Sequence, residues 1–148
     1  MRNFALILLI LILLLTACGQ NRRADEVLAG FCREYPIERQ IYTSVADEND
    51  EGYIDSEMLM TLYGISEYPV REFALVFYGK IDTVREIGVF IIESGDDAIE
   101  VSDLAARRIR FLSSFSEGEG FIKKYRDVLV YGFVEDSSDT ELIFDSIL

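Results

Sequence analysis

The stretch Glu-Phe-Ala-Leu-Val-Phe-Tyr, residues 72–78, decides the fold. Every residue after Glu72 is aliphatic or aromatic, which is typical of a strand that is buried on both faces. Successive side chains of a strand point to opposite faces, so the faces divide as Phe73, Leu75 and Phe77 against Ala74, Val76 and Tyr78. We therefore expect a sheet with two apolar faces, and both faces must be covered.

Three further apolar runs extend this sheet. Residues 87–92 form a second strand after the polar stretch 79–86, and the two strands are expected to be antiparallel neighbours. Residues 121–125 and 128–134 read as a second hairpin that turns at Arg126 and Asp127. The sequence predicts a four-stranded antiparallel sheet made of two hairpins.

The clearest helix spans residues 96–115. Acidic residues begin it and arginines lie near its end, as the helix dipole prefers. Its residues at helical spacing on one face are Val101, Leu104, Ala105, Arg108, Ile109 and Leu112. Shorter helices are predicted up to Tyr35, between an N-cap at Asp55 and a stop at Gly64, and over residues 140–148. Residues 36–46 are compatible with a further amphipathic turn or two.

These elements give an α+β fold in the order helix, helix, strand, strand, helix, strand, strand, helix. We expect the 96–115 helix and the C-terminal helix to share one face of the sheet, and the N-terminal helices to cover part of the other. No internal repeat or low-complexity tract divides the chain, so residues 25–148 are expected to form a single domain.

The N-terminus has the parts of a secretory signal. Arg2 precedes a 12-residue apolar run, residues 4–15, which is shorter than the roughly 20 residues that a membrane-spanning helix needs. The sequence that follows, Leu15-Thr16-Ala17-Cys18, resembles the lipobox of bacterial lipoprotein precursors. This resemblance implies that residues 1–17 are cleaved, that Cys18 carries the lipid, and that residues 18–24 are the tether. The chain is then held by lipid on the extracytoplasmic face of the cell membrane.

Composition excludes several chemistries. Histidine is absent from the chain, so a nucleophile activated by imidazole and a histidine-ligated zinc site are both impossible. Without its signal the chain has 13 basic and 27 acidic side chains, a net charge of −14, which argues against nucleic-acid binding. No cofactor is expected. With Cys18 lipidated, Cys32 has no disulfide partner in the chain and is predicted to be a small buried residue on a helix.

The acidic segment 47–55 follows part of a calcium-loop pattern. Its candidate oxygen ligands are Asp47, Asn49, Glu51 and Asp55, with Gly52 at the sixth position and Ile54 at the eighth. The twelfth position, which requires a bidentate glutamate, is Met58 instead. The favoured interpretation is a solvated acidic loop capped by Asp55, and the alternative is a weak calcium site.

The chain also resembles a family of small lipoproteins of low-GC Gram-positive bacteria, known as domain of unknown function 4358. The motifs that carry this resemblance are Leu62-Tyr63-Gly64-Ile65, Glu86-Ile87-Gly88-Val89-Phe90, the helix with Val101, Leu104, Ala105, Arg107, Arg108 and Ile109, and Val128-Leu129-Val130-Tyr131. The resemblance covers residues 55–148, although the segment 116–120 is shorter than is usual in the family. It implies a lipid-anchored extracytoplasmic domain and supplies no active-site residues.

Together these features predict a non-enzymatic binding or interaction module. Its ligand is unknown, and a protein partner or self-association through the apolar sheet is expected. The arginines Arg107, Arg108 and Arg110 are interpreted as compensating the helix dipole and pairing with acids. The alternatives are a hydrolase that uses only Asp and Glu side chains, and a weak calcium-stabilised surface module.

Overall fold

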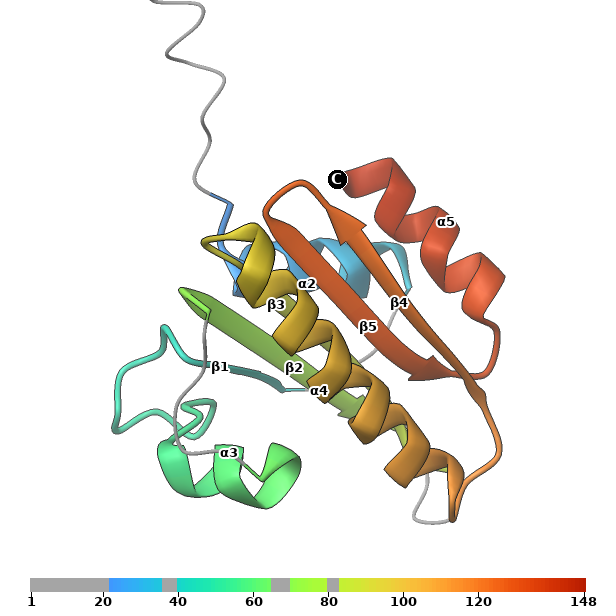
Figure 1. Ribbon diagram of the computed structural model, residues 1–148, viewed down its shortest axis with the longest axis horizontal. Helices are drawn as coiled ribbons and strands as arrows, with labels where there is room; N and C mark the ends of the chain where they lie inside the picture. The colour runs from blue at the N-terminus through green and yellow to red at the C-terminus, as the bar shows by residue number, and fades with distance from the viewer. Residues whose placement is uncertain (1–21, 36–39, 65–69, 80–82) are drawn as a thin grey trace, which may run out of the picture.

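The computed structural model describes residues 22–35, 40–64, 70–79 and 83–148. Its centre is a five-stranded antiparallel sheet in the order β1-β2-β3-β5-β4 (Figure 1). The strands are β1 (Ile41–Thr43), β2 (Glu72–Tyr78), β3 (Arg85–Ile91), β4 (Glu119–Tyr125) and β5 (Val128–Val134). The helices are α2 (Ala24–Glu34), α3 (Ser56–Tyr63), α4 (Gly95–Ser113) and α5 (Ser137–Ile147). The predicted α+β class is confirmed.

The predicted hairpins are both present. In the first hairpin Leu75 of β2 lies opposite Gly88 of β3, and in the second Ile122 of β4 lies opposite Tyr131 of β5. The second hairpin turns at Arg126, whose φ of 56° places it in the left-handed region. The chain joins the hairpins through α4, so that β3 pairs with β5 rather than with β4.

The predicted strand count was wrong, because the sheet has a fifth strand. β1 lies within the ambiguous segment 36–46 and pairs with β2, where Tyr42 lies opposite Leu75. An element of three residues is too short to establish a period of two in the sequence, so its pattern was equally compatible with a helical turn. Residues 36–39, the beginning of that segment, lie outside the described residues.

Two helices cover each face of the sheet, but the predicted pairs were wrong. α2 and α5 share one face, and α3 and α4 share the other (Figure 1). The alternation predicted for β2 is confirmed, because Ala74 and Val76 pack under α2 whereas Phe73 and Leu75 pack towards α3 and α4. Both faces are equally apolar, so hydrophobic pattern could not assign a helix to a face.

Local signals fix the ends of the helices. The Asp55 carboxylate accepts a hydrogen bond from the Met58 N–H at 2.7 Å, and Gly64 ends α3 with a φ of 74°, as predicted. Ser94 and Asp97 form a capping box at the start of α4. Asp136 caps α5 by accepting a hydrogen bond from the Asp139 N–H at 3.1 Å.

The two hydrophobic clusters are built from residues 24–148. One lies beneath α2 and α5, and the other beneath α3 and α4. Within the described ranges, no helix is long and apolar enough to cross a membrane.

Candidate functional site

The beginning of the described chain is docked onto the domain. The Arg22 guanidinium donates a hydrogen bond to the Leu148 backbone oxygen at 2.7 Å, and its own carbonyl accepts one from Arg71 at 3.1 Å. Ala24 is fully buried as the first residue of α2, and its N–H donates to the Glu72 carboxylate at 3.2 Å. Arg22 and Ala24 are thus held against the domain, whereas Arg23 is exposed.

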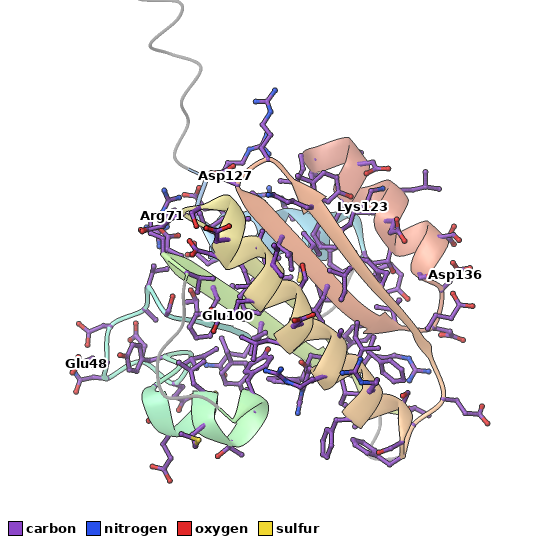
Figure 2. The ribbon with its side chains drawn as sticks, in the orientation of Figure 1. Glu48, Arg71, Glu100, Lys123, Asp127 and Asp136 are labelled. Carbon is purple, nitrogen blue, oxygen red and sulfur yellow. The ribbon has the colours of Figure 1, made fainter. Side chains whose placement is uncertain are left out.

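Cys18, the predicted lipid-bearing residue, lies outside the described residues. Cys18 lies four positions before Arg22 in the sequence, and such a length of chain spans at most roughly 14 Å when fully extended. Figure 2 shows Arg71 and Asp127 at the end of the domain where the described chain begins. A lipid on Cys18 would therefore hold this end of the domain close to the membrane.

The four predicted calcium ligands do not converge on one point as a metal site. The Asp47 carboxylate accepts hydrogen bonds from the N–H and the side-chain amide of Asn49, at 3.0 and 2.8 Å, and these bonds lower the pKa of Asp47. Asp55 caps α3, and Glu51 is exposed. No group of three or more Asp, Glu or Cys side chains suited to a metal ion occurs in the described part of the chain.

Cys32 lies on α2 as a free thiol, half-buried beside the core under α2 and α5. Burial raises the pKa of the thiol, which makes the reactive thiolate scarce at neutral pH. Cys32 was predicted to be a small buried residue on a helix; it lies on a helix, but it is only partly buried.

The most unusual feature of the interior is a buried polar network of Tyr63, Glu86, Arg108 and Tyr131. The Glu86 side chain is 0% exposed and that of Arg108 is 9% exposed. Arg108 donates from Nε to both carboxylate oxygens of Glu86 at 3.0 Å and from Nη2 to Oε2 at 2.6 Å. The hydroxyl of Tyr131 also donates to Glu86. This carboxylate is thus buried and accepts hydrogen bonds from both Arg108 and Tyr131.

The network continues from the sheet to α3. The Tyr63 and Tyr131 hydroxyl oxygens are 2.5 Å apart, and because Tyr131 gives its single proton to Glu86, Tyr63 must donate in this contact. Arg108 also donates from Nη1 to the Leu62 carbonyl at 3.4 Å. α3 is therefore joined to both α4 and β5 by polar contacts beneath its C-terminal end.

Electrostatics favours the protonated forms of Arg108 and Tyr131. Burial, followed by the charge of Glu86, raises the pKa of Tyr131 far above its ordinary value. Burial tends to lower the pKa of Arg108, but the hydrogen bonds and charge of Glu86 outweigh that effect and raise it. At neutral pH, Arg108 stays charged and both donors keep their protons. This arrangement favours a structural role over acid–base chemistry.

The hollows described on the surface of the domain lie away from the network. Three hollows of about 230, 370 and 530 Å³ open on the surface of the described domain, and none of them is lined by a network residue. The first lies between α2 and the end of α5, where Arg22, Arg33 and Ile147 contribute to its wall. None of these three hollows therefore reaches Glu86.

One glycine makes room for the network. An added Cβ at Gly88 of β3 would overlap the ring of Tyr131 on the neighbouring strand. The Tyr131 ring lies there, stacked on Phe90 at a centroid distance of 5.7 Å. Glycine at this position is required by the close approach of the ring, and not by a special backbone angle.

The chain matches no protein-family model, no curated protein and no solved structure. The resemblance to the domain of unknown function 4358 lipoproteins therefore stays a prediction. Its four motifs nevertheless meet in space, because each contributes one member of the buried network: Tyr63, Glu86, Arg108 and Tyr131. The quoted motifs thus correspond to one physical cluster in the structure.

Sequence reasoning missed this network, although two signals pointed towards it. Arg108 lies on the apolar face predicted for the long helix, and Glu86 directly precedes an apolar strand. A charge within an apolar stripe requires a buried partner. Arg108 pairs with an acid, as interpreted, but the pair lies inside the domain and not on its surface. Arg107 and Arg110 are exposed on α4.

Proposed function

We propose that the chain is a lipid-anchored extracytoplasmic protein whose domain is a non-enzymatic binding module. The observation that carries this proposal is the spacing of Cys18, which follows a lipobox-like sequence and precedes the docked Arg22 by four residues. Such a tether keeps the domain at the membrane surface. The absence of histidine from the chain and the enclosed position of Glu86 support binding over catalysis.

The binding surface in this proposal is α4 and not a face of the sheet. The domain's own helices cover both sheet faces, which removes the reason for seeking a partner there. α4 and the turn that follows it instead present large apolar side chains to solvent: Ile99 and Phe111 of α4 are 67% and 58% exposed, and Phe115 of the turn is 52% exposed. The two phenylalanine rings contact each other edge to face at 5.2 Å. Exposed apolar groups on one helix are typical of an interaction surface.

Cys18→Ala tests the anchor. Because the sulfur is the lipid acceptor in lipoprotein precursors, the variant is expected to lose all metabolic label from a fatty-acid analogue and to stay uncleaved. Cys32→Ala is the matched control and is expected to label and mature normally. Label that persists on Cys18→Ala would show that no lipid is carried at this residue.

Site-specific photocrosslinking in cells tests the binding surface. A photoreactive phenylalanine analogue at position 111 is expected to give a discrete crosslinked product, whereas the same analogue at Leu142, which is 65% exposed on α5, is expected to give none. No product from position 111, or equal products from both positions, would contradict binding through α4.

Turnover assays test the non-enzymatic part of the proposal. We expect the purified domain to be inactive on panels of glycan and ester substrates. Turnover that a single Asp or Glu substitution abolishes would replace the binding role with hydrolysis.

A further inference from the structure

We propose that the partner of α4 is a second copy of this chain, docked antiparallel through the α4 outer face. This face consists of exposed residues that carry apolar, acidic and basic side chains: Ile99, Glu100, Asp103, Arg107, Arg110 and Phe111. The inference rests on the proposed binding role of α4 and adds the identity of the partner. Its basis is the order of charges along the helix.

The α4 outer face lies directly opposite the buried side of the helix. Ala105, at the middle of α4, is 0% exposed and packs into the core. At about 100° per residue, Asp103 and Arg107 lie within roughly 20° of the point opposite Ala105, and Glu100 and Arg110 within roughly 40°. Figure 1 shows α4 lying over the sheet with no other element above it in this view.

The four charges of this face lack ion-pair partners among the residues that the structure describes. Asp103 and Arg107 are four residues apart, a spacing that allows a pair within one helix, yet no ion pair joins them in the described structure. The acidic residues lie in the first half of α4 and the arginines in the second. Their charges are thus available to a partner.

The order of these residues makes the face complementary to itself. Residue 105 is the midpoint of Asp103 and Arg107, of Glu100 and Arg110, and of Ile99 and Phe111. A two-fold axis at the level of Ala105 therefore brings Asp103 level with the second copy's arginine at 107, and Glu100 level with its arginine at 110. Ile99 and the phenylalanine at 111 lie at the same height but on opposite edges of the interface, because they are roughly 60° to either side of its centre. Each contact occurs twice, as in other isologous dimers.

The opposite arrangement is unfavourable. Two parallel α4 helices in register would place acid against acid and arginine against arginine, and their helix dipoles would also be parallel. Antiparallel docking instead places acids near arginines and makes the two helix dipoles antiparallel, so both interactions become favourable. Charge complementarity therefore selects both the partner and its direction.

The tether is compatible with this pair in one orientation. The two-fold axis of the pair is perpendicular to α4. If this axis is also normal to the membrane, both copies of Arg22 lie at the same distance from the membrane surface. α4 then lies parallel to the membrane plane, and each Cys18 reaches the lipid through at most roughly 14 Å of chain. Pairing of anchored copies thus requires the domain to lie with α4 along the membrane.

The pair is expected to be weak in solution. α4 has 19 residues and is therefore roughly 28 Å long, and contact along one helix alone falls at the small end of specific protein interfaces. The net charge of −14 on each copy also opposes association, so that physiological salt is needed to screen the distant charges.

Analytical ultracentrifugation of residues 19–148 at about 150 mM salt tests the proposal. We expect the weight-average mass to rise reversibly towards twice that of the monomer as protein concentration increases. Arg110→Glu and Glu100→Arg each place like charges together at two symmetric positions, so each variant is expected to weaken self-association at least about tenfold. Both variants alter exposed side chains, and circular dichroism checks that each one folds.

Mixing the two variants provides the decisive measurement. A chain with Arg110→Glu and a chain with Glu100→Arg are complementary to each other, so an equimolar mixture is expected to regain the association that each variant alone has lost. Lys124→Glu, which makes the same charge change at an exposed position on β4, is the control and is expected to leave association unchanged.

A wild-type domain that stays monomeric, or a mixture that associates no better than its components, would overturn the second-copy inference. The mass of the crosslinked product from position 111 shows whether only the second-copy inference fails or whether the proposed binding role of α4 fails as well. A product of twice the chain's mass supports the second copy. A product with a different protein overturns it and leaves the binding role in place.

Discussion

Arg108→Met removes the cation from the buried network and nearly preserves the length of the side chain. The Glu86 carboxylate, 0% exposed, would lose its three nitrogen contacts and keep only the hydroxyl of Tyr131. Removing one partner of a buried ion pair costs about 3–5 kcal/mol, because the other charge is left without compensation. Since native domains are stable by about 5–15 kcal/mol, this is a large fraction of the total.

Urea denaturation followed by circular dichroism measures this loss as a lower midpoint with an unchanged slope. Arg33→Met, an exposed arginine of α2 without an ion-pair partner in the described structure, is the matched control and is expected to change stability by about 0.5 kcal/mol or less. The double variant Glu86→Leu with Arg108→Met removes both charges. It is expected to be at least about 2 kcal/mol more stable than Arg108→Met alone.

Two outcomes would refute this reasoning. A cost below about 1 kcal/mol for Arg108→Met would show that Glu86 reaches solvent or takes up a proton without penalty. A double variant that is less stable than Arg108→Met would show that Glu86 contributes through packing or other hydrogen bonds, and not through a charge that needs compensation.

Other features give further expectations. Gly88→Ala should destabilise the domain by about 1–3 kcal/mol in the same urea assay, because its methyl group would overlap the ring of Tyr131. Hydrogen bonds from Lys123 and Tyr125 lower the pKa of Asp145, so this carboxylate stabilises the fold above its unfolded pKa of about 3.9 and loses that effect as pH falls through the lower folded value. Asp145→Asn should therefore flatten the fall in stability below about pH 4. Calorimetric titration with calcium should give no saturable binding, and one-to-one binding that Asp47→Ala abolishes would establish a site.

The strands and helices that sequence reasoning found share strong local signals. Residues 72–78 and 128–134 are continuous apolar runs, and α4 has both a long apolar stripe and a capped start. Asp55 and Gly64 mark the ends of α3 by chemistry that acts within one turn. Each of these signals depends on residues that are close together in the chain, so it can be recognised from one sequence without knowledge of the fold.

The features that sequence reasoning missed depend on distant contacts. β1 is defined by its pairing with β2, some 30 residues away in the sequence. The partner of Arg108 could not be chosen among 27 acidic residues, because only the fold brings Glu86 beneath α4. The symmetric order of charges along the α4 outer face can be read from the sequence. Only the structure shows that Ala105, at its midpoint, is buried, so that these charges lie on the exposed side of the helix.

The docked start of the domain determines how mechanical force enters the fold. A pull on a lipid at Cys18 would be transmitted to Arg22, which is held by Leu148 at the end of α5 and by Arg71 at the start of β2. The next residue held by the domain, Ala24, is the buried first residue of α2, and its N–H donates to the side chain of Glu72 at the start of β2. The load therefore reaches the sheet only through side chains at one end of β2. Drag on the domain would therefore strain a few contacts between α2 and its neighbours before any strand begins to unzip.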